Sequence, residues 1–249
     1  MLRCYRTQVM RRVLAILAAA GLALFLTGGI GVAQTNPYSG QGYDTSSYQC
    51  SRAGVAPSSY TFGIVRVTGG RPFSVDSCRQ PLWTQAASTG KPSIYENVAY
   101  STAYAHQVPI SCATASSPEN YSGRYLQAWQ IGCAESDFAF NHRPTGPPAA
   151  AWWLDVETGN SWSSSNPGLN QAAIDGAVDR LLSLHVPVGV YSYAGAWNTI
   201  TTGAGWAPKN AVGSWVAGFN DCRHPFSPLP EWLYQSGTTA WGADADYAC

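Results

Sequence analysis

The sequence predicts an α/β fold in a single domain, an irregular (β/α) barrel of the TIM-like kind. Short apolar runs of strand character alternate with helical patterns, which predicts a largely parallel sheet. Up to eight such runs fit into the 216 residues that follow residue 33 (249 minus 33), and parallel strands with intervening helices close into a barrel at this number. The 45% of hydrophobic residues are ample for one core.

The strand candidates are short apolar runs, several of them β-branched and aromatic. In chain order they cover residues 42–46, 62–69, 92–100, 151–157, 186–193, 212–219, 231–237 and 243–248. Three longer segments between them have apolar residues at helical spacing or end in a helix stop, namely 77–90, 118–142 and 166–185. The last of these gives the clearest helix signal, because it opens with an Asn-Pro pair.

The first 33 residues have the organisation of a secretory signal peptide. Four arginines lie in MLRCYRTQVMRR, a 14-residue apolar run follows, and GVA ends the segment as a cleavage site after Ala33. The alternative is an uncleaved membrane anchor, since apolar character extends weakly to about 20 residues, the length that spans a bilayer. Residues 34–41 are expected to be a flexible lead-in and residues 42–249 to form the barrel.

The net charge of the chain bears on the partners that it can bind, and its cysteine count bears on disulfides. Without the signal segment, 10 basic and 14 acidic residues remain, a net charge near −4 with no basic patch, so nucleic acid is not an expected partner. Six cysteines also remain, and an even number in an exported protein indicates disulfides. Order along the chain favours Cys50–Cys78, Cys112–Cys133 and Cys222–Cys249 among the possible pairings.

No metal or cofactor is predicted. No pair of cysteines has CxxC spacing, and the four histidines form no HExxH pattern. The GGR segment at 69–71 is not a phosphate-binding loop. Serine-hydrolase chemistry is disfavoured as well, because the glycines of GVYSYAG (189–195) are too far apart for a GxSxG turn.

Two acids, Asp155 and Glu157, lie at the end of an apolar, aromatic strand candidate, AWWLDVE. Residues two apart in a strand project to the same side, and the carboxyl ends of barrel strands carry active sites. A carboxyl pair in an apolar setting suits glycoside cleavage, because one member must stay protonated to donate to the leaving oxygen. The alternative is structural: Asp155 caps the following loop and Glu157 is a solvated strand end.

Further acids and aromatic residues favour the catalytic interpretation. The acids end the first and last strand candidates, and the aromatic side chains surround the pair and could stack on sugar rings or belong to the core. These residues are Asp44, Asp244, Asp246, Trp152, Trp153 and Trp162.

The motifs resemble those of glycoside hydrolase family 25, the Chalaropsis-type lysozymes. GYDTSSYQ (42–49) is similar to the family's first strand, FGIVRVTGG (62–70) to its second, and WWLDVE (152–157) to its catalytic strand. PVGVYS, WVAGF, LYQS and ADAD (243–246) resemble later strands in order. The chain departs from the pattern at Tyr234-Gln235-Ser236, where the family has Trp-Gln-Tyr, at Glu96 and Asn97 on the third strand, and in its six cysteines.

The resemblance implies a secreted, monomeric N-acetylmuramidase-like enzyme acting on β-1,4 bonds of cell-wall peptidoglycan. Glu157 would be the general acid and then base, and Asp155 would stabilise charge at an oxocarbenium centre or on an attacking N-acetyl group. Asp44 and Asp244 would complete the acidic cluster, with Asp246 as the competitor for Asp244. Candidates for substrate contact, each equally placed to be barrel core, are Tyr191, Tyr234 and Gln235; Asp246 is a further candidate for contact.

A non-enzymatic alternative is a glycan-binding or wall-associated barrel that keeps the carboxylates without productive geometry. Cleavage of purified cell walls would distinguish the two, because a binding module retains glycan without releasing reducing ends.

Overall fold

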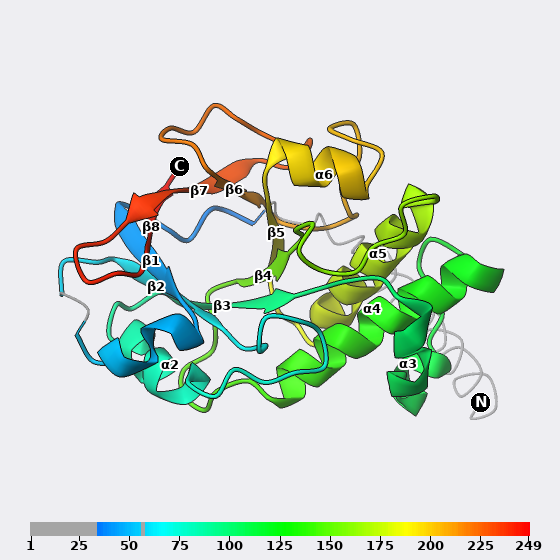
Figure 1. The fold of residues 1–249 in the computed structure, drawn as a ribbon, viewed down its shortest axis with the longest axis horizontal. Helices are drawn as coiled ribbons and strands as arrows, with labels where there is room; N and C mark the ends of the chain where they lie inside the picture. The colour runs from blue at the N-terminus through cyan, green and yellow to red at the C-terminus, as the bar shows by residue number, and fades with distance from the viewer. Residues whose placement is uncertain (1–33, 56–57) are drawn as a thin grey trace, which may run out of the picture. The chain divides into compact units, whose positions relative to one another are not determined.

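A computed structural model describes residues 34–55 and 58–249, and residues Thr35–Cys249 form one compact unit. The predicted signal peptide lies outside the described residues. Eight strands form a closed barrel in the order in which they occur along the chain (Figure 1). They are β1 Gln41–Thr45, β2 Phe62–Arg66, β3 Pro92–Asn97, β4 Trp152–Asp155, β5 Val188–Ser192, β6 Ser214–Ala217, β7 Glu231–Thr238 and β8 Asp244–Ala248. The predicted barrel is confirmed.

The closing strand departs from a regular (β/α) barrel. Strands β1 to β7 pair in parallel with their neighbours, whereas β8 is antiparallel to both β7 and β1. A tight turn makes this possible, because the Thr239 N–H donates to the Ala243 carbonyl over 2.7 Å. The start of β8, rather than its end, therefore lies at the barrel mouth that the carboxyl ends of the other strands form.

The three predicted helices are confirmed with tighter bounds, as α2 Arg79–Ala87, α4 Gly123–Asn141 and α5 Pro167–Ser183. Four short helices had no predicted counterpart, namely η1 Ser47–Arg52, η2 Thr102–Gln107, α3 Ile110–Ala113 and α6 Ala194–Ile200. Each has seven residues or fewer, which is too short to show helical periodicity. No helix separates β6 from β7 within residues 58–249, so helices cover only part of the barrel.

Helices α4 and α5 run side by side against the barrel (Figure 1). Two glycines allow this close approach: a Cβ on Gly132 would lie 1.8 Å from the Ala173 carbonyl oxygen, and one on Gly176 would lie 1.9 Å from that of Trp129. No side chain fits at either position.

Residues 34–41 are not the flexible lead-in that the sequence predicts. Tyr38 is 7% exposed and its hydroxyl lies 2.6 Å from the Ser93 hydroxyl and 3.0 Å from the Trp153 indole nitrogen, which donates to it. The Asn36 amide donates to the Trp232 carbonyl over 2.9 Å. Tyr38 thus packs inside the barrel below the strand residues that lead to the mouth, and Gln41 already belongs to β1.

Inside the barrel, four strands change from an apolar to a polar side chain over their last two inward positions. Ile64 is followed two residues later by Arg66, Tyr95 by Asn97, Trp153 by Asp155 and Leu233 by Gln235. The lower members form one apolar cluster with Trp215 and Phe62. Because residues two apart face the same side of a strand, this pattern stacks a ring of polar side chains on a dry aromatic floor.

All three cysteine pairs favoured by chain order are disulfides: Cys50–Cys78, Cys112–Cys133 and Cys222–Cys249. Each closes a loop of fewer than 30 residues, with separations of 28, 21 and 27. Among the described helices, none has the length and apolar character needed to cross a bilayer.

Candidate active site

A cavity of about 340 Å³ lies at the barrel mouth, and the four predicted catalytic acids surround it. Its lining residues come from all eight strands and from loops at the mouth. They are Asp44, Ser46, Tyr48, Arg66, Gly70, Tyr95, Asn97, Asp155, Glu157, Gly159, Asn160, Tyr191, Trp215, Gln235 and Asp244. An adjoining groove of about 500 Å³ shares Glu157, Tyr191 and Gln235 with this cavity, so Glu157 lies where the groove and the cavity meet.

Asp155 is held from one side and free on the other. It pairs in register with Asn97 of β3, whose amide N–H donates to Asp155 Oδ2. The Thr68 hydroxyl holds Asn97 at two points, because it donates to the side-chain Oδ1 over 2.8 Å and accepts from the backbone N–H over 2.9 Å. Asp155 is 6% exposed, and its Oδ1 has no hydrogen-bond partner among the described residues.

Glu157 lies beyond the end of β4, two residues after Asp155. The strand ladder continues for one more bond, from the Val156 N–H to the Tyr191 carbonyl over 3.0 Å, so both carboxyls reach the same cavity. The Trp162 indole N–H donates to the Glu157 carbonyl over 2.8 Å and fixes the backbone there. Glu157 is half-buried and its carboxyl accepts no hydrogen bond from the residues described.

Asp44 is positioned by a chain of hydrogen bonds from β5 and β7. The Tyr191 hydroxyl donates to Gln235 Oε1 over 2.8 Å, and the Gln235 amide donates to Asp44 Oδ2 over 2.7 Å. Two predicted substrate contacts, Tyr191 and Gln235, therefore line the cavity and also orient a carboxylate. The Arg66 guanidinium, which pairs with Asp76 at 3.2 Å, adds one positive charge to the wall.

The structure separates the two aspartates of ADAD. Asp244 begins β8, pairs in register with Asp44 and lines the cavity. Asp246 is fully buried below it and accepts a 2.9 Å hydrogen bond from the Trp215 indole. The prediction that Asp246 contacts substrate therefore does not fit its buried position. The prediction that Asp244 ends its strand is also wrong: Asp244 begins β8 and reaches the mouth because β8 is antiparallel to its neighbours.

Tyr234 lies apart from this group. It neighbours Gln235 in β7 and therefore projects to the opposite face, where its ring stacks on Tyr247 with centroids 5.0 Å apart. The prediction of substrate contact does not fit this placement.

The carboxyls of the mouth have raised pKa values. Burial, and then the charge of Asp244, raises the pKa of Asp44 to about 7. Burial and the neighbouring charge of Glu157 raise the pKa of Asp155 well above its ordinary value, and burial raises the pKa values of Glu157 and Asp244. Burial and the Asp44 charge also raise the pKa of Asp246 well above its ordinary value. Such a cluster keeps protons near neutral pH.

Sequence reasoning assigned no role to Asn97, Thr68 or Arg66. The signal available for Asn97 and Arg66 was their phase, since each ends its strand on the inward-facing register that Asp155 also occupies. No group of three or more His, Cys, Asp or Glu side chains in residues 34–55 and 58–249 is arranged to hold a metal ion.

No protein-family model and no curated protein sequence matches the chain. Solved structures share its fold at low identity. A bacterial lysozyme from Streptomyces coelicolor is 15% identical with a TM-score of 0.56, over 85% of this chain and 93% of that one. A family GH25 lysozyme from Aspergillus fumigatus is 14% identical with a TM-score of 0.54, over 85% of this chain and 94% of that one. A family 25 glycosyl hydrolase from Bacillus anthracis is 13% identical with a TM-score of 0.55, over 86% of this chain and 91% of that one. The chain therefore has the barrel fold of the family 25 lysozymes.

Proposed function

We propose that the protein is a glycoside hydrolase that cleaves β-1,4 bonds of bacterial peptidoglycan, with Glu157 as general acid and base. The observation that carries the proposal is the carboxyl pair at one cavity, in which Asp155 is fixed by Asn97 and keeps one buried oxygen free. The shared fold supports the same class, because similar structures include the Cpl-1 endolysin complexed with a peptidoglycan analogue, with 12% identity and a TM-score of 0.52.

The two carboxyls take different roles because their surroundings differ. Burial and the Glu157 charge favour a protonated Asp155, but the hydrogen bond from Asn97 opposes them by favouring its ionised form. Glu157 accepts no such bond from the described residues, so in this proposal the pair's proton is on Glu157 when the reaction begins. Protonated Glu157 donates to the glycosidic oxygen as the bond to the anomeric carbon breaks. The Glu157 carboxylate then takes a proton from the water that completes hydrolysis.

Asp155 acts on the sugar that loses its leaving group. Its free Oδ1 is a buried acceptor that needs a donor, and the N–H of a 2-acetamido group supplies one. Holding that N–H orients the acetamido oxygen toward the anomeric carbon, and the carboxylate stabilises the positive charge that develops there. This arrangement favours the substrate-assisted route over a carboxylate nucleophile.

Cleavage of purified peptidoglycan tests the proposal. Turbidity loss, appearance of reducing ends and a mass spectrum of the released muropeptides report activity, the bond cut and the terminal sugar together. Reducing N-acetylmuramic acid ends are expected. Retention on walls without reducing ends would instead establish the binding-module alternative.

Secretion is part of the same proposal. The signal-like segment predicts cleavage after Ala33, and the three disulfides are compatible with an oxidising compartment. N-terminal sequencing of the exported protein is expected to start at Gln34, and thiol titration after denaturation is expected to find no free cysteine. Two or more free thiols would contradict it.

A further inference from the structure

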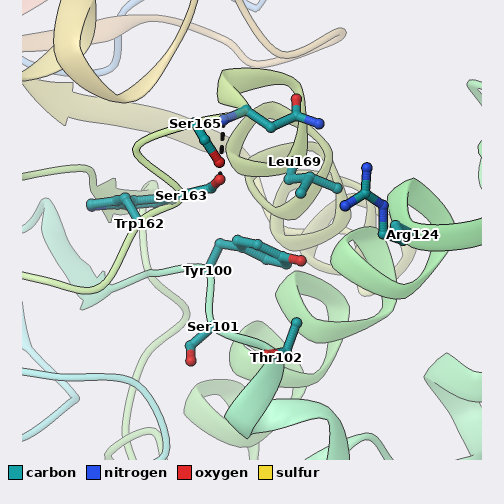
Figure 2. A pocket seen from close by; sticks show the side chains of 9 residues that line it. Tyr100, Ser101, Thr102, Arg124, Trp162, Ser163, Ser165 and Leu169 are labelled. Carbon is teal, nitrogen blue, oxygen red and sulfur yellow. Dashed lines mark hydrogen bonds between the residues drawn. The ribbon is translucent and has the colours of Figure 1, made fainter.

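A second cavity, of about 460 Å³, lies beside the candidate active site. Figure 2 shows the side chains that line it. One loop separates the two: Gly159 and Asn160 line the mouth cavity, and Trp162 and Ser163 line the second. Strand β3 and the segment after it also line both cavities, since Asn97 at the end of β3 lines the first and Tyr100 the second. A polymer bound across Glu157 therefore passes close to both cavities.

The second cavity differs from the first in charge. No Asp or Glu lines it, and its ionisable side chains are Arg124 and the Tyr100 phenol. Arg124 is exposed, and its guanidinium has no hydrogen-bond or ion-pair partner among the described residues. In Figure 2 the Tyr100 ring crosses the middle of the pocket between Trp162 and Arg124. An unpaired cation among hydroxyls and aromatic faces is suited to an anionic, partly apolar ligand.

The walls of this cavity are fixed before a ligand binds. The Cys112–Cys133 disulfide ties the segment after β3 to α4. The Tyr100 N–H donates to the Ser161 carbonyl over 2.8 Å, and the buried Glu135 carboxylate accepts from the Ala99 N–H over 3.0 Å. Preorganised walls lower the entropy cost of binding.

We infer that the second cavity binds the carboxylate-bearing peptide that peptidoglycan carries on its glycan strand, with Arg124 pairing with a peptide carboxylate. The inference rests on the proposed function for the glycan, but its site is separate from the catalytic carboxyls. Peptide and glycan are one molecule in peptidoglycan, and the adjacent cavities match that linkage. A neutral glycan segment could accept hydrogen bonds from Arg124 but would supply no counter-charge for its guanidinium.

The test compares hydrolysis of intact glycan strands with hydrolysis of strands whose peptides have been removed. Wild type is expected to show a higher kcat/KM on peptide-bearing strands, and Arg124→Ala to lower that value by roughly three- to tenfold. Bare strands, which carry nothing for Arg124 to pair with, should be cut equally by both proteins. Arg143→Ala, which removes the same charge from the loop before β4, serves as the control and should leave both values unchanged.

Binding of the free acidic peptide to wild type and Arg124→Ala, measured by calorimetry at low and high salt, separates this inference from the proposed function. Salt-sensitive binding lost in Arg124→Ala supports it even if no glycan is cut. Equal peptide-to-bare ratios in wild type and Arg124→Ala, or equal peptide binding by both, would overturn it while leaving the glycosidase proposal intact. If kcat/KM rises with the length of bare strands and does not respond to the peptide, a neutral glycan segment occupies the cavity instead, and the inference is overturned.

Discussion

Two groups of buried or half-buried acids lie on opposite sides of β3 and differ in what surrounds them. The mouth cluster of Asp44, Asp155, Glu157 and Asp244 lines an open cavity. Behind the strand, Glu96 faces Glu135 of α4, and the two are 0% and 2% exposed. Both groups have raised pKa values, by burial first in each case.

The difference between the two groups lies in access rather than in protonation. The Ser136 hydroxyl donates to one oxygen of Glu96 and the Ala99 N–H to one oxygen of Glu135, while the second oxygen of each acid has no partner among the described residues. Neither acid lines the mouth cavity. A raised carboxyl pKa therefore marks burial, and only the acids that also reach a substrate-sized space are candidates for catalysis.

The largest expected effect is on Glu157. Glu157→Gln keeps the size of the side chain but cannot donate and recover a proton, so the rate on peptidoglycan should fall by about 10²- to 10⁴-fold. Glu96→Gln is the matched control and should keep the wild-type rate. Initial rates, with circular dichroism to verify folding, provide the measurement. If Glu157→Gln keeps more than about a tenth of the activity, another residue is the acid.

Asp155 and its partner should come next. Asp155→Asn is expected to lower kcat by about 10²-fold because it removes a charge from a dry site. Asn97→Ala should lower kcat by about tenfold with little change in KM, since Asn97 only positions Asp155. Equal kcat values for wild type and Asn97→Ala would show that the β3 amide has no part in the reaction.

The strands were predictable because their signal is local. Apolar runs bounded by breakers located all eight, and the Asp155–Glu157 motif marked the strand whose two carboxyls line the mouth cavity. The orientation of β8 was not predictable in this way, because it depends on the Thr239–Ala243 turn and on pairing with both β1 and β7. Only the orientation of β8 shows which aspartate of ADAD lines the cavity, Asp244, and which is buried, Asp246.

Contacts between side chains on different strands could not be predicted from the sequence for a related reason. Asn97 and Asp155 are 58 residues apart, and their contact follows from the register of two strands rather than from either segment alone. Tyr38 illustrates the opposite case, since a polar, proline-containing segment predicted a lead-in and one aromatic side chain placed it inside the barrel. Long-range packing overrides local composition at both sites.

Within ADAD, the two aspartates should differ in effect. Asp244→Asn removes a charge from the cavity wall and lowers the pKa of Asp44, so a loss of about tenfold in kcat/KM is expected. Asp246→Asn should cost only a few-fold, because an amide oxygen still accepts the Trp215 N–H and the native side chain is held protonated. Rates measured on one peptidoglycan preparation decide between them, and a larger loss for Asp246→Asn would reverse the assignment.

Glu96→Gln should leave activity unchanged and alter only the pH dependence of stability. Burial raises the pKa of Glu96 from 4.5 to about 8, so the folded state keeps a proton that the unfolded chain loses between these values. The stability that this proton confers is therefore fully present below about pH 4.5 and lost as the pH rises through about 8. Glutamine cannot ionise, so the variant should lack that decline.

The size of the decline follows from the pKa change. A rise from 4.5 to about 8 corresponds at most to about 5 kcal/mol, at about 1.4 kcal/mol per pKa unit. Urea unfolding at pH 5 and pH 9 measures it as the difference between wild type and Glu96→Gln, which cancels the contribution of the mouth acids. Parallel pH dependences in the two proteins would contradict the prediction. A decline in wild type alone, with equal rates of hydrolysis, would show that burial without a cavity shapes stability and not catalysis.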